Sequence, residues 1–390
     1  MNRMNNTLFI ASRLKYRRKI VTVSIAISYI VMIVAMAVSS GFRHEVRNAL
    51  SEMGGDIQLC PYNLNYLDES QPVDAAPSYL PLVEQVRGVE SVVPAVYRAG
   101  IVKTGEDIHG VVVKGVETQD TMALSVSIPR RLSQMGGLSV GDKMLTYFIG
   151  EKVRARSFRI ASIYDPVIET DDKLIVYADI EDMQRLNGWT EGQASMLEIR
   201  MKPQCRDEES IEAATQEIGF LAYAHSSEDK TNVYASSAPS RYPQLFDWLD
   251  LLDFNVLFIL ALMMVVAGFN MMSGLLITLF ENISTIGVFK AMGMTDKSIS
   301  KVFLASSAAT VFKGMIVGNA LALAFCLLQD KLHLLKLDPA NYFVSFVPVN
   351  PDMLNVLAVD VISFGVIMLI LLIPTMFISK VDPADTVKVR

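Results

Sequence analysis

The chain contains 390 residues, of which 51% are hydrophobic and 19% are charged, and its mean hydropathy is +0.34. This composition is too apolar for a purely soluble protein and too charged for one that lies wholly within a membrane, so we expect both kinds of region. The net charge of −6 gives no reason to expect nucleic acid, whose binding requires a clustered basic face. Three cysteines are too few for a disulfide scaffold or a Cys-rich metal site.

The first 40 residues predict a membrane anchor. Residues 1–19 carry six lysines and arginines beside a short apolar set, which is typical of an amphipathic helix in the headgroup layer. Residues 20–40 contain no charge and are long enough to form a first span. A cleaved signal peptide is the alternative, because Ala35-Met-Ala37 fits a cleavage site. The further apolar stretches downstream favour a retained span.

The central region, residues 41–253, is polar. Short β-branched or alternating runs, such as 108–113 and 158–163, are interspersed with helix-like stretches such as 208–218. This mixture predicts a large α+β extracytoplasmic domain between helices 1 and 2 of an α-helical membrane protein with four transmembrane helices.

Three further apolar stretches complete the expected membrane region. A polar segment separates each from the next, and a charged tail follows the last. The expected segments are 254–280 (second span), 281–301 (coupling segment), 302–329 (third span), 330–353 (outer loop), 354–378 (fourth span) and 379–390 (tail).

The distribution of lysine and arginine predicts the orientation in the membrane. Residues 1–19 hold six of these cations, 281–301 three and the tail three, against two in 330–353. Cationic loops stay on the cytoplasmic side, whereas a long domain such as 41–253 is translocated largely regardless of charge. We therefore expect a multi-pass protein with both ends and the coupling segment in the cytoplasm.

The segment from Glu281 to Gly293 keeps a helical apolar stripe although its overall character is polar. Glycine at its end is a typical helix stop. We interpret the segment as a short helix on the membrane surface whose apolar side enters a partner, and an ordinary connector between two spans is the alternative. The apolar positions are Ile283, Ile286, Val288, Phe289 and Met292.

Motifs that would indicate an enzyme fail on their context. Gly137-Leu-Ser-Val-Gly141 has the spacing of a nucleophile elbow but neither the strand before it nor the helix after it. His44-Glu45 begins a zinc motif whose second histidine would stand where the chain has Asn48. The sequence contains no G-x-x-x-x-G-K-[ST] phosphate loop, so we do not expect the chain to be the ATPase itself. The four histidines, His44, His109, His225 and His333, are scattered and indicate no metal site. We therefore expect no enzyme, and no metal or cofactor bound by this chain.

Several motifs are similar to those of one transporter family. They are Phe9-Ile-Ala-Ser-Arg-Leu near the start, Ala267-x-Phe-Asn270 in the second span, Ile286-Gly-Val-x-Lys-Ala-Met-Gly293 after it, and Lys380-Val-Asp-Pro-Ala-Asp385 in the tail. In this order they resemble ABC transporter permeases of the FtsX/MacB superfamily, in particular the lipoprotein-releasing LolC/LolE type with a MacB-like periplasmic domain. The resemblance implies that 281–301 holds a coupling helix for a separate ATPase. The residues that it assigns to ATPase coupling are Glu281, Ile286, Gly287, Phe289, Lys290, Met292 and Gly293.

The resemblance also implies a function. The chain would be the membrane subunit that extracts lipoproteins from the cell inner membrane for transfer towards the outer membrane. ATP and magnesium would bind to a LolD-like ATPase. A second permease copy in a homodimer, the lipoprotein and a LolA-like periplasmic chaperone are the other expected partners. A MacB-like efflux permease, an FtsX-like mechanotransmitting permease or a membrane-anchored receptor are the alternatives.

Methionines in the first two spans are candidates for an acyl-lined substrate cavity, because methionine adapts its shape to varied apolar groups. Generic lipid-facing packing is the alternative explanation. The five candidates are Met32, Met36, Met263, Met264 and Met271.

Overall fold

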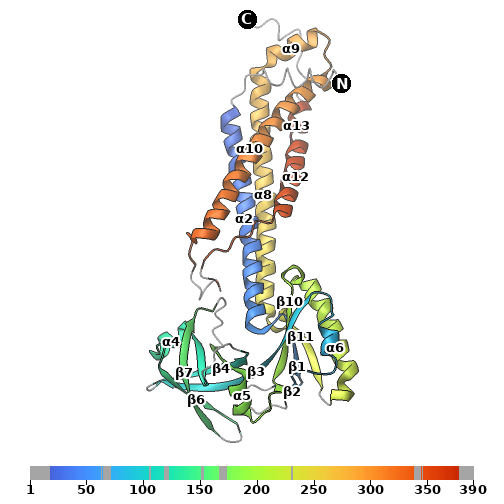
Figure 1. Cartoon of the computed structure of the whole chain (residues 1–390). Helices are drawn as coiled ribbons and strands as arrows, with labels where there is room; N and C mark the ends of the chain where they lie inside the picture. Colours follow the sequence, from blue (N-terminus) through green and yellow to red (C-terminus); the bar gives the residue numbers. More distant parts are fainter. Residues whose placement is uncertain are drawn as a thin grey trace. The chain divides into compact units, whose positions relative to one another are not determined.

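The computed structural model describes residues 18–62, 64, 72–104, 107–117, 123–150, 153–166, 174–229, 232–337, 344 and 346–376 (Figure 1). The expected amphipathic helix, apart from its last residues, and the tail 379–390 lie outside this part. The chain divides into two compact units. The helical unit comprises Met1–His44, Trp248–Lys336 and Phe346–Arg390, and the α+β unit comprises Glu45–Asp247 and Leu337–Ser345.

Four helices of the described part are long and apolar enough to cross a membrane, and they contain or overlap the four expected spans. The bounds are α2 (Arg18–Gly54), α8 (Pro243–Glu281), α9 (Ile283–Ala291), α10 (Asp296–Leu332), α12 (Met353–Ile370) and α13 (Leu372–Thr375). Two shorter helices belong to the same unit: α9 lies between α8 and α10, and α13 follows α12.

Helices α2 and α8 continue well past the apolar runs that predict their membrane parts. Polar contacts between them account for part of this extension. Asp253 of α8 accepts a hydrogen bond from Ser39 and pairs with Arg43, both on α2. Phe42 and Trp248 meet edge to face beside these groups, with ring centroids 5.9 Å apart. The charged residues mark the end of the apolar run in the sequence. The helices nevertheless continue past them, because these polar side chains pair with one another.

The core of the helical unit lies between α2, α8 and α10. Tyr29, Met271 and Phe303 are among its fully buried members. Gly314 and Gly318 of α10 face α2 so closely that an added Cβ at either position would come within 2.7 Å of α2. The pair therefore brings two helices together, as expected of a G-x-x-x-G spacing in a membrane protein.

The α+β unit contains a nine-stranded sheet with the order β11-β1-β10-β3-β4-β8-β5-β7-β6, and β6 also pairs with β3. A further two-stranded sheet joins β2 and β9. The strand bounds are β1 (Ile57–Pro61), β2 (Val73–Asp74), β3 (Val89–Thr104), β4 (Asp107–Val116), β5 (Ser125–Pro129), β6 (Lys143–Phe148), β7 (Arg154–Tyr164), β8 (Leu174–Asp179), β9 (Gln193–Ala194), β10 (Met196–Met201) and β11 (Val233–Ser237).

Pairing of β6 with β3 closes the six strands β3, β4, β8, β5, β7 and β6 into a barrel, which we call the barrel lobe. Its core contains Val113, Phe148 and Phe158, and α4 (Arg130–Gly136) and α5 (Ile180–Asn187) pack against it. We call the strands β11, β1 and β10 with the first half of β3 the sheet lobe, whose core is covered by α3 (Leu80–Val83) and α6 (Glu208–Asp229). The short helix η1 (Pro203–Cys205) precedes α6, and α7 (Ala238–Arg241) precedes α8. The expectation of an α+β domain is confirmed.

Candidate coupling site

A short helix, α9, lies in the segment expected to form a coupling helix, and its end is fixed by a specific backbone motif. Gly293 adopts a left-handed conformation with φ of +86°. Its N–H donates to the carbonyl of Lys290, and the N–H of Met294 donates to the carbonyl of Phe289. These two bonds form a Schellman motif, in which a glycine without Cβ closes the helix. Gly293 therefore stops the helix, and α10 starts three residues later at Asp296.

One side of α9 is buried against the other helices of the permease. Ile286 is 1% exposed and Gly287 is also buried, and Phe289 packs against the same core as α2 and α10. Ile286 and Gly287, both assigned to ATPase coupling by the resemblance, are therefore buried within this chain, and their coupling role stays a prediction. An amphipathic pattern shows which face of a helix is buried but not what covers that face. In α9 part of the apolar face packs against the other helices of the same chain.

The exposed face of α9 carries smaller residues. Val288 is 47% exposed and Met292 is 67% exposed, and Ser284 and Ala291 are exposed beside them. Glu281, the last residue of α8, is exposed as well. These side chains can touch a partner without any change in the helical unit.

Lys290 has a partner within the chain. Its Nζ lies 3.0 Å from Oδ1 of Asp296 in the first turn of α10, and the lysine side chain is only 11% exposed. The pair connects the last turn of α9 to the helix that follows. Together with the packing of Ile286 and Phe289 against the bundle core, it anchors α9 to the helical unit.

The five methionines proposed for a substrate cavity do not line a common open surface. Met32 and Met271 are fully buried in the bundle core, and Met263 and Met264 pack partly buried against it. Met36 packs partly buried against a second cluster. The exposed faces of α2 and α8 carry other apolar side chains, which include Val23, Ile27, Leu262, Val265 and Phe269.

A network of polar side chains holds the end of α2 inside the α+β unit. Two side chains donate to the last carbonyl groups of this helix: Lys114 of β4 to Met53 at 2.8 Å and Gln58 of β1 to Gly54 at 2.8 Å. Arg241 of α7 donates to the carbonyl of Gly55, the first residue after the helix, at 2.6 Å. Carbonyls at a helix end lack partners within the helix and carry partial negative charge, so cationic donors stabilise them.

Lys114 is almost fully buried and pairs with Glu198 of β10 at 2.8 Å. The other oxygen of Glu198 accepts from the hydroxyl of Tyr97. Burial lowers the pKa of the Lys114 ammonium, and the charge of Glu198 opposes this shift. The pair therefore satisfies two charges in the core of the unit where either alone would be strongly unfavourable.

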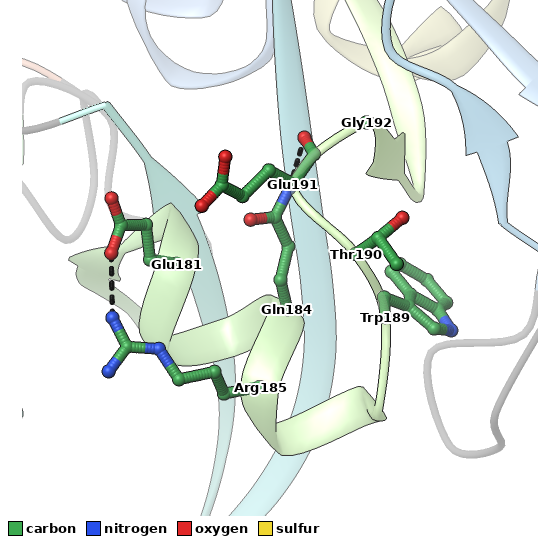
Figure 2. A pocket seen from close by; sticks show the side chains of 7 residues that line it. All are labelled: Glu181, Gln184, Arg185, Trp189, Thr190, Glu191 and Gly192. Atoms are coloured by element: carbon green, nitrogen blue, oxygen red, sulfur yellow. Dashed lines mark hydrogen bonds and ion pairs between the residues drawn. The ribbon is translucent and has the colours of Figure 1, made fainter.

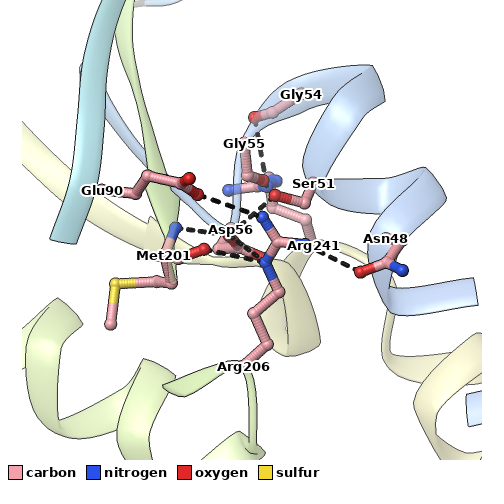
Figure 3. A network of polar contacts seen from close by, with 9 residues as sticks. All are labelled: Asn48, Ser51, Gly54, Gly55, Asp56, Glu90, Met201, Arg206 and Arg241. Carbon is pink, nitrogen blue, oxygen red and sulfur yellow. Dashed lines mark hydrogen bonds and ion pairs between the residues drawn. The ribbon is translucent and has the colours of Figure 1, made fainter. Parts of the chain in front are cut away.

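Asp56 completes the network on the other side of the helix end (Figure 3). Its carboxylate accepts from the hydroxyl of Ser51 at 2.8 Å and from the N–H of Met201 at 2.7 Å, and Arg206 lies 3.4 Å away. Burial raises the pKa of this carboxyl, whereas these hydrogen bonds lower it. Arg206 also donates to Asn48 on α2, so the network ties α2, β10 and the η1 region together.

Sequence reasoning did not single out these network residues. One signal was present, because Lys114 interrupts the apolar run of β4 and a buried charge requires a partner. Nothing in the sequence connects it with Glu198, which lies 84 residues away.

The described residues contain no group of three or more His, Cys, Asp or Glu that could hold a metal ion. Cys60, Cys205 and Cys326 are free thiols.

Two family profiles match the sequence. The MacB-like periplasmic core domain matches residues 20–221, more than half of the chain, and the FtsX-like permease C-terminal profile matches residues 257–383. Two of the similar curated proteins are named lipoprotein-releasing system transmembrane protein LolC. The protein from Neisseria meningitidis serogroup B is 21% identical and that from Xylella fastidiosa strain 9a5c is 19% identical. Each match covers 93% of this chain and 92% of the relative.

Among solved structures, the periplasmic region of MacB from Actinobacillus actinomycetemcomitans matches with a TM-score of 0.32 and 12% identity, over 50% of this chain and 95% of that chain. The two profiles follow one another along the sequence, with residues 222–256 between them, and together they cover most of the four apolar helices and most of the α+β unit. The chain belongs to the family of ABC transporter permeases that combine a MacB-like periplasmic core domain with an FtsX-like permease region.

Proposed function

We propose that this permease extracts lipoproteins from the inner membrane and passes them towards the outer membrane, driven by a separate ATPase subunit. The observation that carries the proposal is the similarity to proteins named LolC along 93% of the chain, which includes both the membrane helices and the α+β unit. A LolD-like ATPase would bind ATP and magnesium, and a LolA-like chaperone would accept the released lipoprotein. We place both ends and α9 in the cytoplasm and the α+β unit in the periplasm.

The ATPase binds, in this proposal, to the exposed face of α9. Val288 and Met292 enter its surface, while Ile286, Phe289 and the Lys290–Asp296 pair fix α9 to the bundle. A push on α9 is then transmitted to α8 and α10 because the three helices share buried contacts. In this proposal the residues that anchor α9 position the helix, and the exposed residues make the contact with the ATPase.

The functional permease contains two copies of this chain. Closed twofold symmetry is the commonest arrangement of soluble oligomers, and we extend it to this membrane complex. The exposed apolar side chains of α2 and α8, rather than the buried methionines, form the wall that faces lipid or the second copy. Native mass spectrometry of the purified complex tests this point, and an obligatory second, different permease chain would contradict it.

Reconstituted transport tests the proposed function. The chain and its ATPase are placed in proteoliposomes with a triacylated lipoprotein, and ATP is added with a soluble lipoprotein-binding acceptor. We expect transfer of the lipoprotein to the acceptor only when ATP can be hydrolysed. A matched lipoprotein without its acyl chains should neither be retained nor stimulate hydrolysis. ATP hydrolysis that the lipoprotein does not stimulate, with no transfer, would refute lipoprotein extraction.

Efflux of a different cargo is the second candidate function. It is favoured by the match of residues 20–221 to a domain described as MacB-like. The same proteoliposomes distinguish the two, because an efflux permease would respond to a cargo that carries no acyl chains. Stimulation of ATP hydrolysis by such a cargo, and not by lipoprotein, would favour efflux.

A further inference from the structure

A cavity of about 620 Å³ lies beside α5 in the α+β unit, and none of the functions discussed above uses it (Figure 2). Helix α5 contributes Glu181, Gln184 and Arg185 to its wall. The segment between α5 and β9 contributes Trp189 and Glu191.

Gln184 determines the chemistry of this cavity. The side chain is 4% exposed, and its Nε2 donates to the carbonyl groups of Glu191 at 3.0 Å and Gln193 at 2.9 Å. Both amide hydrogens are thereby used, so the orientation of the amide is fixed by its partners. The remaining atom, Oε1, points towards the cavity between Glu181 and Glu191, and it has no hydrogen-bond partner within the described residues (Figure 2).

The charges around the cavity are unbalanced. Arg185 pairs with Glu181 at 2.6 Å and lies 4.0 Å from the buried Asp182. The carboxylate of Glu191 forms no ion pair with any described residue. The residues that line the cavity therefore carry two carboxylates, those of Glu181 and Glu191, and one guanidinium, that of Arg185.

We propose that this cavity binds the primary ammonium group of an alkylamine. An ammonium group has three donors and no acceptor, and the cavity offers Gln184 Oε1 and the carboxylates of Glu191 and Glu181. The volume also accommodates the alkyl chain that carries the ammonium group, and Trp189 is one of the residues that line it. The amine comes from a lysine side chain of a protein that meets the α+β unit, or from a free diamine.

The chain offers a spectroscopic probe for this site, because its two tryptophans are Trp189 and Trp248. Full-length protein in detergent is labelled with 5-fluorotryptophan, and Trp248→Phe assigns the two fluorine signals. The protein is titrated with N-acetyl-lysine methylamide, with cadaverine and with N-acetyl-norleucine methylamide, which lacks the amine. We expect a saturable shift of the Trp189 signal with the two amines and none with the norleucine compound. Tighter binding of cadaverine than of the lysine compound would identify a free diamine as the ligand, and the reverse would identify a lysine side chain.

Charge-neutral variants complete the test. Glu191→Gln keeps the shape of the side chain and should weaken amine binding about threefold or more, as expected for loss of one exposed charge partner. Glu217→Gln removes an exposed carboxylate on α6, outside the cavity wall, and should leave binding unchanged. An unchanged Trp189 signal in the absence of amine shows that Glu191→Gln is folded. The proposal is overturned if the amines give no saturable shift, if the norleucine compound gives the same shift, or if Glu191→Gln binds the amines as tightly as the unaltered chain.

Discussion

Lys114 contributes strongly to the stability of the α+β unit at the end of α2. Its ammonium group serves the Met53 carbonyl and Glu198 at once, and the side chain is 1% exposed. Lys114→Met should lower the free energy of unfolding of the α+β unit by about 3–5 kcal/mol, because it leaves a buried carboxylate without its cation. Thermal unfolding of the purified chain in detergent measures the effect.

The double variant Lys114→Met with Glu198→Gln is the control. It removes both charges, so it should be less destabilised than the sum of the two single variants. Strict additivity would show that the two side chains act independently and that the ion pair contributes nothing.

Tyr177 makes a pH-dependent contribution in the same region. Burial raises its pKa to about 12 from the ordinary value of 10.0. The unfolded chain loses this proton first as the pH rises, so the stability that the neutral phenol contributes is present below pH 10 and is lost as the pH approaches 12. Tyr177→Phe should flatten the fall in melting temperature over this range. An identical alkaline profile in both proteins would contradict the assignment.

At the scale of single elements, α9 separates residues that position the helix from residues that contact a partner. Val288→Asp and Met292→Asp place a charge on the exposed face, so they should reduce co-purification of the ATPase while the permease inserts normally. Phe289→Asp should instead disturb the bundle, because Phe289 packs against its core. Lys297→Glu, an exposed change in the first turns of α10, is the control for charge alone.

The outcome can be read from two measurements on the same preparations, namely detergent-stable yield and ATPase stoichiometry. If Val288→Asp and Met292→Asp kept the full ATPase stoichiometry and substrate-stimulated hydrolysis, the proposed docking face would be wrong.

The helices α10 and α12 are joined by a polar pair whose geometry also predicts a result. Asn319 Nδ2 donates to Asp360 Oδ2 at 2.6 Å, and within the described residues the Oδ1 atoms of Asn319 and Asp360 are buried without a partner. Asp360→Asn should preserve the melting temperature, since two amides can exchange two hydrogen bonds. Asp360→Leu should lower it, since the Asn319 amide then loses its partner at a penalty of about 1–3 kcal/mol. Equal stability of the two variants would show that the pair is dispensable.

How far the sequence predicts an element depends on whether its signal is local. The apolar runs that form α2, α8, α10 and α12 are local, and each predicted span lies within or overlaps a helix. The face on which α9 is buried depends on packing against other helices, namely the distant α2 and the following α10, so the periodicity could identify the apolar stripe but not its neighbour. For the same reason Met32 and Met271 were candidates for a cavity, although contacts with other helices bury them.

At the scale of the whole molecule, the proposed orientation makes a labelling experiment decisive. Asp107→Cys and Lys297→Cys each introduce one cysteine at an exposed position, in a chain whose three native cysteines have been replaced. An impermeant thiol reagent added to intact spheroplasts should label Asp107→Cys and not Lys297→Cys, because 41–253 is placed outside and 281–301 inside. The opposite labelling pattern would reverse the orientation.

The class of the α+β unit follows from its mixture of short runs, but its topology does not. The barrel lobe closes through pairs such as Ile101 with Tyr147, which are remote in sequence and carry no local mark of their partnership. Register between distant strands is set by packing in the assembled core, and alternation of side chains within one strand contains no information on which strand lies beside it.

The strand β3 has a consequence for how the unit unfolds. Its first residues pair with β10 in the sheet lobe, and from Val96 onwards it pairs with β4 in the barrel lobe. The strand is continuous from Val89 to Thr104, so neither hydrophobic core can lose it without weakening the other. Two lobes that share a strand in this way should melt in a single cooperative transition, and their amide protons should exchange with solvent at similar limiting free energies.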